Sequence, residues 1–254
     1  MSAAGDSGRA GGAAGGGGSL ASETWKELRR HRGAMAGAWI FAVVCVAVLV
    51  APLLTPYAND AQELEAQLQP PSWQHPFGTD LAGRDLYTRV LYGGRISLAV
   101  GFVATLVSLV IGISWGAIAG YAGGRVDEAM MRFVDVLYAL PFMFFVILLV
   151  AYFGRSIVLL FVALGCVQWL TMSRIVRGQI LSLKQQAFVE AARALGVPGR
   201  RIIFRHLVPN LLGPVIVYAT LTVPTVMLEE AFLSFLGLGV SPPDSSWGLL
   251  AAEG

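Results

Sequence analysis

Few residues of this 254-residue sequence have the types and spacing that catalysis requires. Residues 112–116 (GISWG) formally match the G-x-S-x-G pattern of serine hydrolases, with Ser114 as the nucleophile. That pattern exposes its serine only where a strand turns sharply into a helix, whereas here the flanking residues form an unbroken apolar run. The histidines, at 31, 75 and 206, lie outside the apolar runs, and no G-x-x-x-x-G-K-[ST] phosphate loop occurs. We therefore expect a non-catalytic chain that does not itself bind ATP.

The composition points to a membrane protein. Apolar residues make up 56% of the chain and charged residues 13%, against about 25% charged in ordinary soluble domains. Both cysteines, Cys45 and Cys166, lie inside apolar runs, so the sequence predicts neither a metal site nor a disulfide framework. These features argue against a soluble enzyme, a disordered protein and a disulfide-rich secreted module.

The uncharged segments are long enough to cross a bilayer as helices. A hydrocarbon core needs about 20 apolar residues per helix, and lipid leaves no partner for unpaired backbone groups. We expect an all-α polytopic bundle with five transmembrane helices at residues 36–54, 96–121, 134–153, 156–171 and 211–236. Residues 1–22 are predicted to be a disordered Gly/Ala-rich tail, residues 23–35 a basic juxtamembrane segment, and residues 36–254 the transmembrane domain.

Lys and Arg residues set the expected orientation. They cluster before the first span and between the fourth and fifth, where a single acid, Glu190, stands among seven basic residues, whereas the loop after the first span is acidic. Because cytoplasmic loops carry the excess of Lys and Arg, the N-terminus is expected in the cytoplasm.

Within the second span, Gly112, Gly116 and Gly120 recur every four residues and share one helix face. Small residues in this spacing let membrane helices approach closely. We expect this face to pack against a neighbouring helix or subunit, with a sliding surface for gating as the alternative.

The predicted cytoplasmic loop at 172–207 contains a short capped helix. Residues 185–195 (QQAFVEAARAL) favour a helix that Gly196 ends as a left-handed cap, with Pro198 beyond it. Phe188, Ala191, Ala192 and Leu195 fall on one face at helical spacing. A helix this short is poorly stable alone, so the apolar face must pack either on the chain's own spans or on a cytosolic partner.

This loop resembles the EAA loop of bacterial ABC-importer permeases, E-A-A-x3-G-x9-I-x-L-P. Glu190, Ala191, Ala192 and Gly196 match, and the ending reads HLVP at 206–209, with His and Val in place of Ile and Leu. Residues 75–98, 120–130, 135–141 and 229–243 are also similar to the second permease subunit of dipeptide, oligopeptide and nickel importers. The resemblance covers residues 24–254 in order, and it implies the bacterial cytoplasmic membrane as the location.

The resemblance implies a permease subunit with six membrane helices. This sequence contains five predicted spans and is expected to end before the sixth. The resemblance also implies a homologous second permease, two ATP-binding subunits that hold ATP and Mg²⁺, and an extracytoplasmic substrate-binding protein, and no nucleic acid. Glu190, Ala191, Ala192, Leu195 and Gly196 would contact the ATPase. Peptide import is the expected function, and import of nickel or another small solute is the alternative.

Several charged residues and one proline support further predictions about individual positions. Glu229 and Glu230 could line the solute path or only hydrogen-bond a neighbouring helix, since carboxylates in membrane segments face protein or water. Asp135 is expected to pair with Arg132 or Arg125, and Asp80 with Arg84 in a short helix. Pro141 should kink the third span. Two alternatives are an intramembrane enzyme and a scaffolding protein. The sequence shows no catalytic cluster for an enzyme, and a scaffolding protein would not need the capped helix.

Overall fold

The computed structural model describes residues 29–154, 156–240 and 243–253. The chain divides into two units, residues 1–46 and 47–254, each described by itself. The predicted tail at 1–22 lies outside the described residues, as does the juxtamembrane segment before Arg29. The described part of the first unit is mainly the start of helix α2 (Arg32–Leu49).

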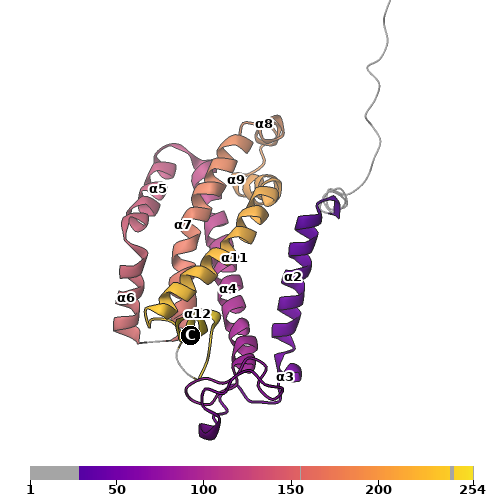
Figure 1. Cartoon of the computed structure of the whole chain (residues 1–254). Helices are drawn as coiled ribbons and strands as arrows, with labels where there is room; N and C mark the ends of the chain where they lie inside the picture. Colours follow the sequence, from indigo (N-terminus) through magenta and orange to yellow (C-terminus); the bar gives the residue numbers. More distant parts are fainter. Residues whose placement is uncertain (1–28, 155, 241–242, 254) are drawn as a thin grey trace, which may run out of the picture. The chain divides into compact units, whose positions relative to one another are not determined.

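The second unit is a helical bundle (Figure 1). Its long helices are α4 (Leu86–Ala122), α7 (Ile157–Leu183) and α11 (Leu212–Phe235), and α4 and α7 share the most extensive contact. The remaining elements are α3 (Ala51–Leu54), a 3-10 turn (Leu64–Ala66), α5 (Gly124–Ala139), α6 (Phe142–Phe153), α8 (Ala187–Ala194), α9 (Gly199–Arg201), a π-helical turn (Ile202–Leu207), α10 (Val208–Asn210) and α12 (Trp247–Glu253). Within the described ranges there is no strand, only one bridge between Thr79 and Asp85.

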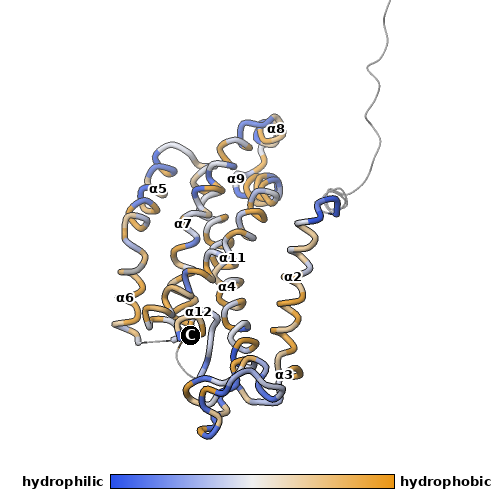
Figure 2. The backbone as a smooth tube through the Cα atoms, in the orientation of Figure 1, coloured by the Kyte–Doolittle hydropathy of each residue, from blue (hydrophilic) through white to orange (hydrophobic). Residues whose placement is uncertain are grey.

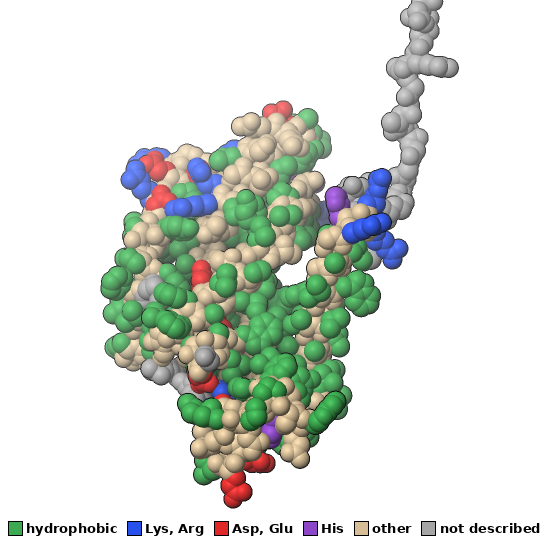
Figure 3. All heavy atoms as spheres, viewed as in Figure 1, with side chains coloured by type: hydrophobic (Ala, Val, Ile, Leu, Met, Phe, Trp, Pro, Cys, Tyr) green, Lys and Arg blue, Asp and Glu red, His purple; other side chains and the backbone are tan. Residues whose placement is uncertain are grey.

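The all-α membrane architecture is confirmed. Four helices are long and apolar enough to cross a bilayer, namely α2, α4, α7 and α11, and α5 with α6 makes a fifth candidate if the bent pair is one span. Figure 2 shows hydrophobic residues along the middle of the bundle helices and hydrophilic residues at their ends. Figure 3 shows hydrophobic side chains over the same middle region and Lys and Arg gathered near the start of α5.

Two predicted spans are too short. The second was expected at 96–121, but α4 begins at Leu86, because the Asp85 carboxylate caps it by accepting the Thr88 N–H at 2.7 Å. The fourth was expected at 156–171, but α7 continues to Leu183. The loop predicted at 172–207 therefore begins only after α7, near Lys184. Charge marks where the lipid ends, and a helix can continue beyond that point.

The other three spans agree better. The first, expected at 36–54, is divided between α2 and α3, and the fifth, expected at 211–236, coincides with α11 within one residue at each end. The third, expected at 134–153, is broken at Leu140 and Pro141 with a bend of 78° between the two helices. The kink at Pro141 is thus confirmed. Leu140 is extended, the conformation that a following proline favours.

Candidate functional site

Helix α8 ends in a complete Schellman cap. Gly196 has φ +72°, its N–H donates to Arg193 O at 2.9 Å, and the Val197 N–H donates to Ala192 O at 3.1 Å. Both bonds satisfy carbonyls that a helix end otherwise leaves unpaired. The predicted glycine cap is confirmed, although the helix begins at Ala187 instead of Gln185.

The apolar residues of α8 are divided between two faces. Val189 is fully buried and Ala192 is 7% exposed, and both belong to a core cluster that includes Ile202 and Leu207. By contrast, Glu190 and Ala191 are exposed and Leu195 is 83% exposed. The face predicted from Phe188, Ala191, Ala192 and Leu195 is therefore split, with only Ala192 turned inward. One face packs on the chain itself and the other remains open.

The buried face connects α8 to three long helices. The cluster that holds Val189 also contains residues of α4, α7 and α11, namely Ala117, Val176, Ile180 and Val215, together with Leu211 just before α11. Lys184 Nζ donates to Gly120 O, at the end of α4, over 2.8 Å. The Arg193 guanidinium lies 5.1 Å from the centroid of the Tyr121 ring, a cation–π contact. Helix α8 thus meets α4 through Arg193 and Tyr121, and it shares one core cluster with residues of α7 and α11.

Sequence reasoning did not single out Lys184 and Val189, which contribute to these contacts. Val189 is apolar and lies between residues of the predicted face, so helical spacing alone did not decide which side would be buried. Lys184 appeared only as one basic residue among many. Neither residue carried a sequence signal that distinguished it.

The glycine face of α4 packs against α7. A Cβ atom on Gly112 would lie 2.6 Å from Met172 Cβ, one on Gly120 would lie 2.9 Å from Ile180 Cγ2, and one on Gly116 would overlap the carbonyl oxygen of Ser173. These distances are shorter than carbon and oxygen atoms tolerate, so only glycine permits this approach. Gly124, the next in the series, has open space around it and φ +55°.

Ion pairs hold α7 to α5 near the same end of the bundle. Arg177 donates to both Asp127 oxygens at 2.6 and 2.7 Å, a bidentate geometry. Asp135 pairs with Arg174 at 2.7 Å, not with Arg132 or Arg125 as expected, and Arg132 pairs with Glu128 at 3.3 Å. The expectation for Asp135 was wrong because it was limited to arginines near in sequence, whereas the partner lies across on α7.

The two glutamates of the fifth span occupy different environments. Glu229 is partly exposed, and its carboxylate accepts hydrogen bonds from Gln168 on α7. Glu230 is 0% exposed and accepts hydrogen bonds from the hydroxyls of Ser234 and Ser246, both at 2.7 Å. Glu230 therefore ties α11 to the segment before α12 and has no surface on a path. Both residues were predicted as candidates for lining the solute path, and only Glu229 has exposed surface that could do so.

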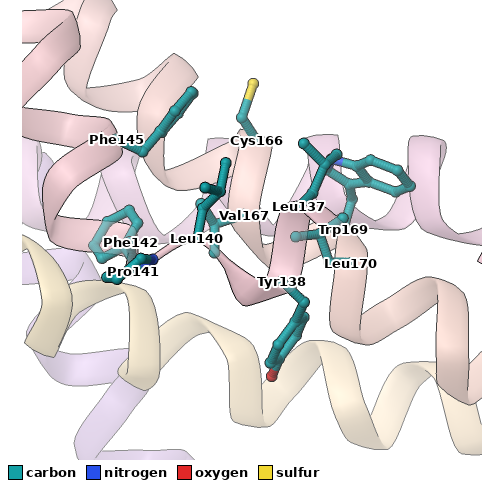
Figure 4. Close-up of a pocket in the computed structure, with 10 residues that line it drawn as sticks. All are labelled: Leu137, Tyr138, Leu140, Pro141, Phe142, Phe145, Cys166, Val167, Trp169 and Leu170. Atoms are coloured by element: carbon teal, nitrogen blue, oxygen red, sulfur yellow. The ribbon is translucent and has the colours of Figure 1, made fainter. Parts of the chain in front are cut away.

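A cavity of about 460 Å³ lies where α5 breaks into α6, against α7 (Figure 4). Its lining is almost entirely apolar and includes Leu140, Pro141, Val167 and Leu170. The side chains of Phe145 and Cys166 point away from that of Tyr138 (Figure 4). No charged residue among those described lines this cavity, so we interpret it as a gap in the packing at the helix break.

The formal hydrolase pattern has no catalytic geometry. Ser114 lies in the middle of α4 and donates to Val110 O at 2.7 Å. His75 and Asp85 are 3.0 Å apart, but the nearby Ser72 hydroxyl accepts from the backbone N–H of His75, not from its ring. In the described ranges, no group of three His, Cys, Asp or Glu side chains could hold a metal ion.

Asp80 and Arg84 form the predicted pair in a turn, not in a helix. Arg84 Nε donates to Asp80 Oδ2 at 2.8 Å, and Arg89 donates to the same oxygen at 2.8 Å. Burial by itself raises the pKa of Asp80, but hydrogen bonds from the backbone of Arg84 and Ala82 and from the Arg84 side chain outweigh it and lower the pKa below 3.8. The ionised carboxylate thus stabilises this loop.

Two family models match the chain. The model described as binding-protein-dependent transport system inner membrane component matches residues 112–254, and the model described as N-terminal TM domain of oligopeptide transport permease C matches residues 19–71. The first model covers the end of α4 and the chain from α5 to α12, including the α8 loop, and the second covers α2 and α3.

Several curated proteins are similar over most of their length. The oligopeptide transport system permease protein OppC of Haemophilus influenzae is 48% identical over 93% of this chain and 76% of its own length. The OppC protein of Escherichia coli is 49% identical over 91% and 78%, and the dipeptide transport system permease protein DppC of Bacillus subtilis is 45% identical over 93% and 74%.

A solved structure of the MetNI methionine ABC transporter in inward-facing conformations has the same fold. The similarity has a TM-score of 0.55 at 19% identity and covers 63% of this chain and 76% of that chain.

Proposed function

The chain belongs to the family of inner-membrane components of binding-protein-dependent transport systems, and we propose that it is one of two permease subunits of an ATP-driven importer of di- and oligopeptides. It is a multi-pass membrane protein with the role of a transporter permease. The observation that carries the peptide substrate is the 45–49% identity to dipeptide and oligopeptide permeases over more than nine tenths of the chain.

In this proposal, ATP and Mg²⁺ are bound by two partner ATPase subunits, and this chain supplies the contact that receives their motion. The open face of α8, with Glu190, Ala191 and Leu195, docks in a groove of the ATPase. Support comes from the size of the exposed groups: an alanine allows close approach, Leu195 offers apolar surface, and Glu190 can pair with a basic group on the partner. Gly196 ends the helix and adds no side chain at that point.

The buried face of α8 would transmit the movement. Val189 and Ala192 are packed in the same core as Ala117 of α4, Ile180 of α7 and Val215 of α11. Protein interiors are close-packed and resist compression, so a rigid shift of α8 is passed on to the packed helices. We propose that nucleotide-driven closure of the ATPases moves these helices and opens the path on one side of the membrane at a time.

The remaining partners complete this assembly. A homologous permease would provide the other half of the path, and an extracytoplasmic binding protein would deliver the solute. The excess of Lys and Arg around α8 supports a cytoplasmic location for that end, and hence for the N-terminus.

Co-purification followed by transport tests this function. The tagged chain, expressed with its neighbouring genes and extracted in mild detergent, should bring down a second permease and two ATPases. After reconstitution with the binding protein, the complex should take up a labelled dipeptide only when ATP is supplied. Uptake of ⁶³Ni²⁺ without any uptake of peptide would contradict the peptide assignment, and recovery of the chain without an ATPase would contradict the importer itself.

A further inference from the structure

Glu229 is a carboxylate in a membrane helix without a cationic partner among the residues that the structure describes. Its two oxygens accept hydrogen bonds from the Nε2 amide of Gln168 at 2.9 and 2.8 Å. The amide supplies a dipole but no compensating charge. An ionised side chain in a membrane segment is costly unless it faces water or an oppositely charged group. The partly exposed surface of Glu229 must therefore meet one of the two.

Polar residues continue from Glu229 along one face of α11. Thr225 is exposed and Thr222 partly exposed, and they lie four and seven residues before Glu229, so all three share a face. On α7, Thr171 is exposed one turn beyond Gln168, and its hydroxyl is 3.5 Å from the hydroxyl of Tyr138 on α5. These groups form what we call the polar strip: Tyr138, Gln168, Thr171, Thr222, Thr225 and Glu229.

Apolar residues border the polar strip on α11. Leu221 and Leu228 are also strongly exposed, and they lie four residues before and three residues after Thr225, so that border suits lipid or an apolar protein surface. Glu230, the next residue, is turned into the bundle and held by serine hydroxyls. A single face of the helix thus combines exposure, polarity and an uncompensated carboxylate.

We propose that the polar strip lines the solute path and that Glu229, positioned by Gln168, is a subsite for a primary ammonium group, in the imported solute the N-terminal ammonium of a peptide. This inference rests on the proposed function. Each carboxylate oxygen of Glu229 has a further lone pair beyond the one used by Gln168. A charge-assisted hydrogen bond from an ammonium to such an oxygen is stronger than one between neutral groups.

The first test measures hydration and charge along the polar strip without any peptide. In the intact complex, with Cys45 and Cys166 replaced by serine, the Thr225→Cys variant is treated with a cationic and with an anionic methanethiosulfonate reagent. The cationic reagent should react about three- to tenfold faster, and the added Glu229→Gln change should remove this preference. An unreactive thiol would mean that the face is covered by lipid or by a partner, and equal rates would mean that Glu229 creates no cation site; either result overturns the inference.

The second test compares a dipeptide with its N-acetylated form at equal occupancy of the binding protein. The Glu229→Gln variant should transport the free dipeptide about tenfold more slowly, because a charge-assisted bond is lost, and Glu229→Asp should restore part of the rate. For the acetylated peptide, the ratio of the wild-type rate to the Glu229→Gln rate should stay near one. Glu128→Gln, at an exposed position on α5, is the matched control and should change neither rate.

The outcomes separate this inference from the proposed function. Suppose that the wild-type complex transports the dipeptide. If the Glu229→Gln variant then transports the dipeptide as fast as wild type, or transports the free and acetylated peptides more slowly by the same factor, only the ammonium subsite is overturned. A wild-type complex that transports no peptide overturns both.

Discussion

At the scale of single residues, the glycines of α4 and the carboxylate of Asp80 show how one side chain sets local geometry. Gly112, Gly116 and Gly120 contribute by having no side chain, which brings α4 against Met172 and Ile180 of α7. Asp80 contributes by its charge, which Arg84 and Arg89 neutralise in a tight turn. Both effects are local and can be tested by conservative substitutions.

The Gly116→Ala substitution should destabilise the bundle. The added methyl group would overlap Ser173 O, and overpacking of this kind costs about 1–3 kcal/mol. Thermal unfolding of the purified chain in detergent would measure the change. Gly178→Ala is the matched control, since α7 leaves open space at that position, and it should be neutral or stabilising by at most about 1 kcal/mol. Equal melting temperatures for the two variants would contradict close packing of α4 on α7.

Protonation of Asp80 should weaken its loop. Because the folded-state pKa lies below 3.8, ionised Asp80 adds stability above that pH, and the contribution is lost as the pH falls from 3.8 towards the folded-state pKa. The melting temperature of the wild-type protein should therefore fall with pH more steeply in this window than that of Asp80→Asn. Asp60→Asn, at an exposed position, should keep the wild-type slope. Identical slopes for wild type and Asp80→Asn would show that the turn does not depend on this charge.

At the scale of elements, α8 is a short helix with one buried and one open face. Its buried face explains how so short a helix is stable, since Val189 and Ala192 are packed in the core of the bundle. Its open face, with Ala191 and Leu195, leaves apolar surface without a partner in the described chain. The Schellman cap at Gly196 fixes where this face ends.

The Gly196→Trp substitution should uncouple ATP hydrolysis from transport. A Cβ atom at Gly196 meets nothing within 4 Å in the described chain, so we expect the indole to project towards the proposed docking partner. The left-handed φ of +72° adds strain of about 1 kcal/mol. Gly196→Ala carries the same strain without the bulk and is the control. We expect ATPase activity to persist in the Trp variant while peptide uptake falls at least tenfold, with both activities retained in Gly196→Ala. Normal uptake by Gly196→Trp would show that this helix end does not contact a moving partner.

Local signals in the sequence predicted some elements well and others poorly. Pro141 and Gly196 act on their own backbone, so the break in the third span and the end of α8 could be predicted from residue type. The extension of α7 to Leu183 could not, because Arg174 and Arg177 look like the start of a loop until they are seen to pair with Asp135 and Asp127 of α5. The burial of Val189 also depends on residues distant in the sequence, here Ile202 and Leu207.

At the scale of the whole molecule, the 47–254 unit connects a proposed motor contact to a proposed solute path. One core cluster joins α8 to α4, α7 and α11, and the last two of these helices carry Gln168 and Glu229. The account's central claim is that the open face of α8 sits on an ATP-hydrolysing partner.

Site-directed cross-linking tests that claim most directly. Ala191→Cys and, separately, Leu195→Cys are made in the intact complex with Cys45 and Cys166 replaced by serine, alongside Glu128→Cys at an exposed position on α5. A short thiol cross-linker should join both α8 positions to an ATPase subunit that carries single cysteines along its groove, with a yield that changes when ATP is trapped, and should leave Glu128→Cys unlinked. If neither α8 position links to an ATPase in any nucleotide state, α8 is not the contact between this permease and its motor.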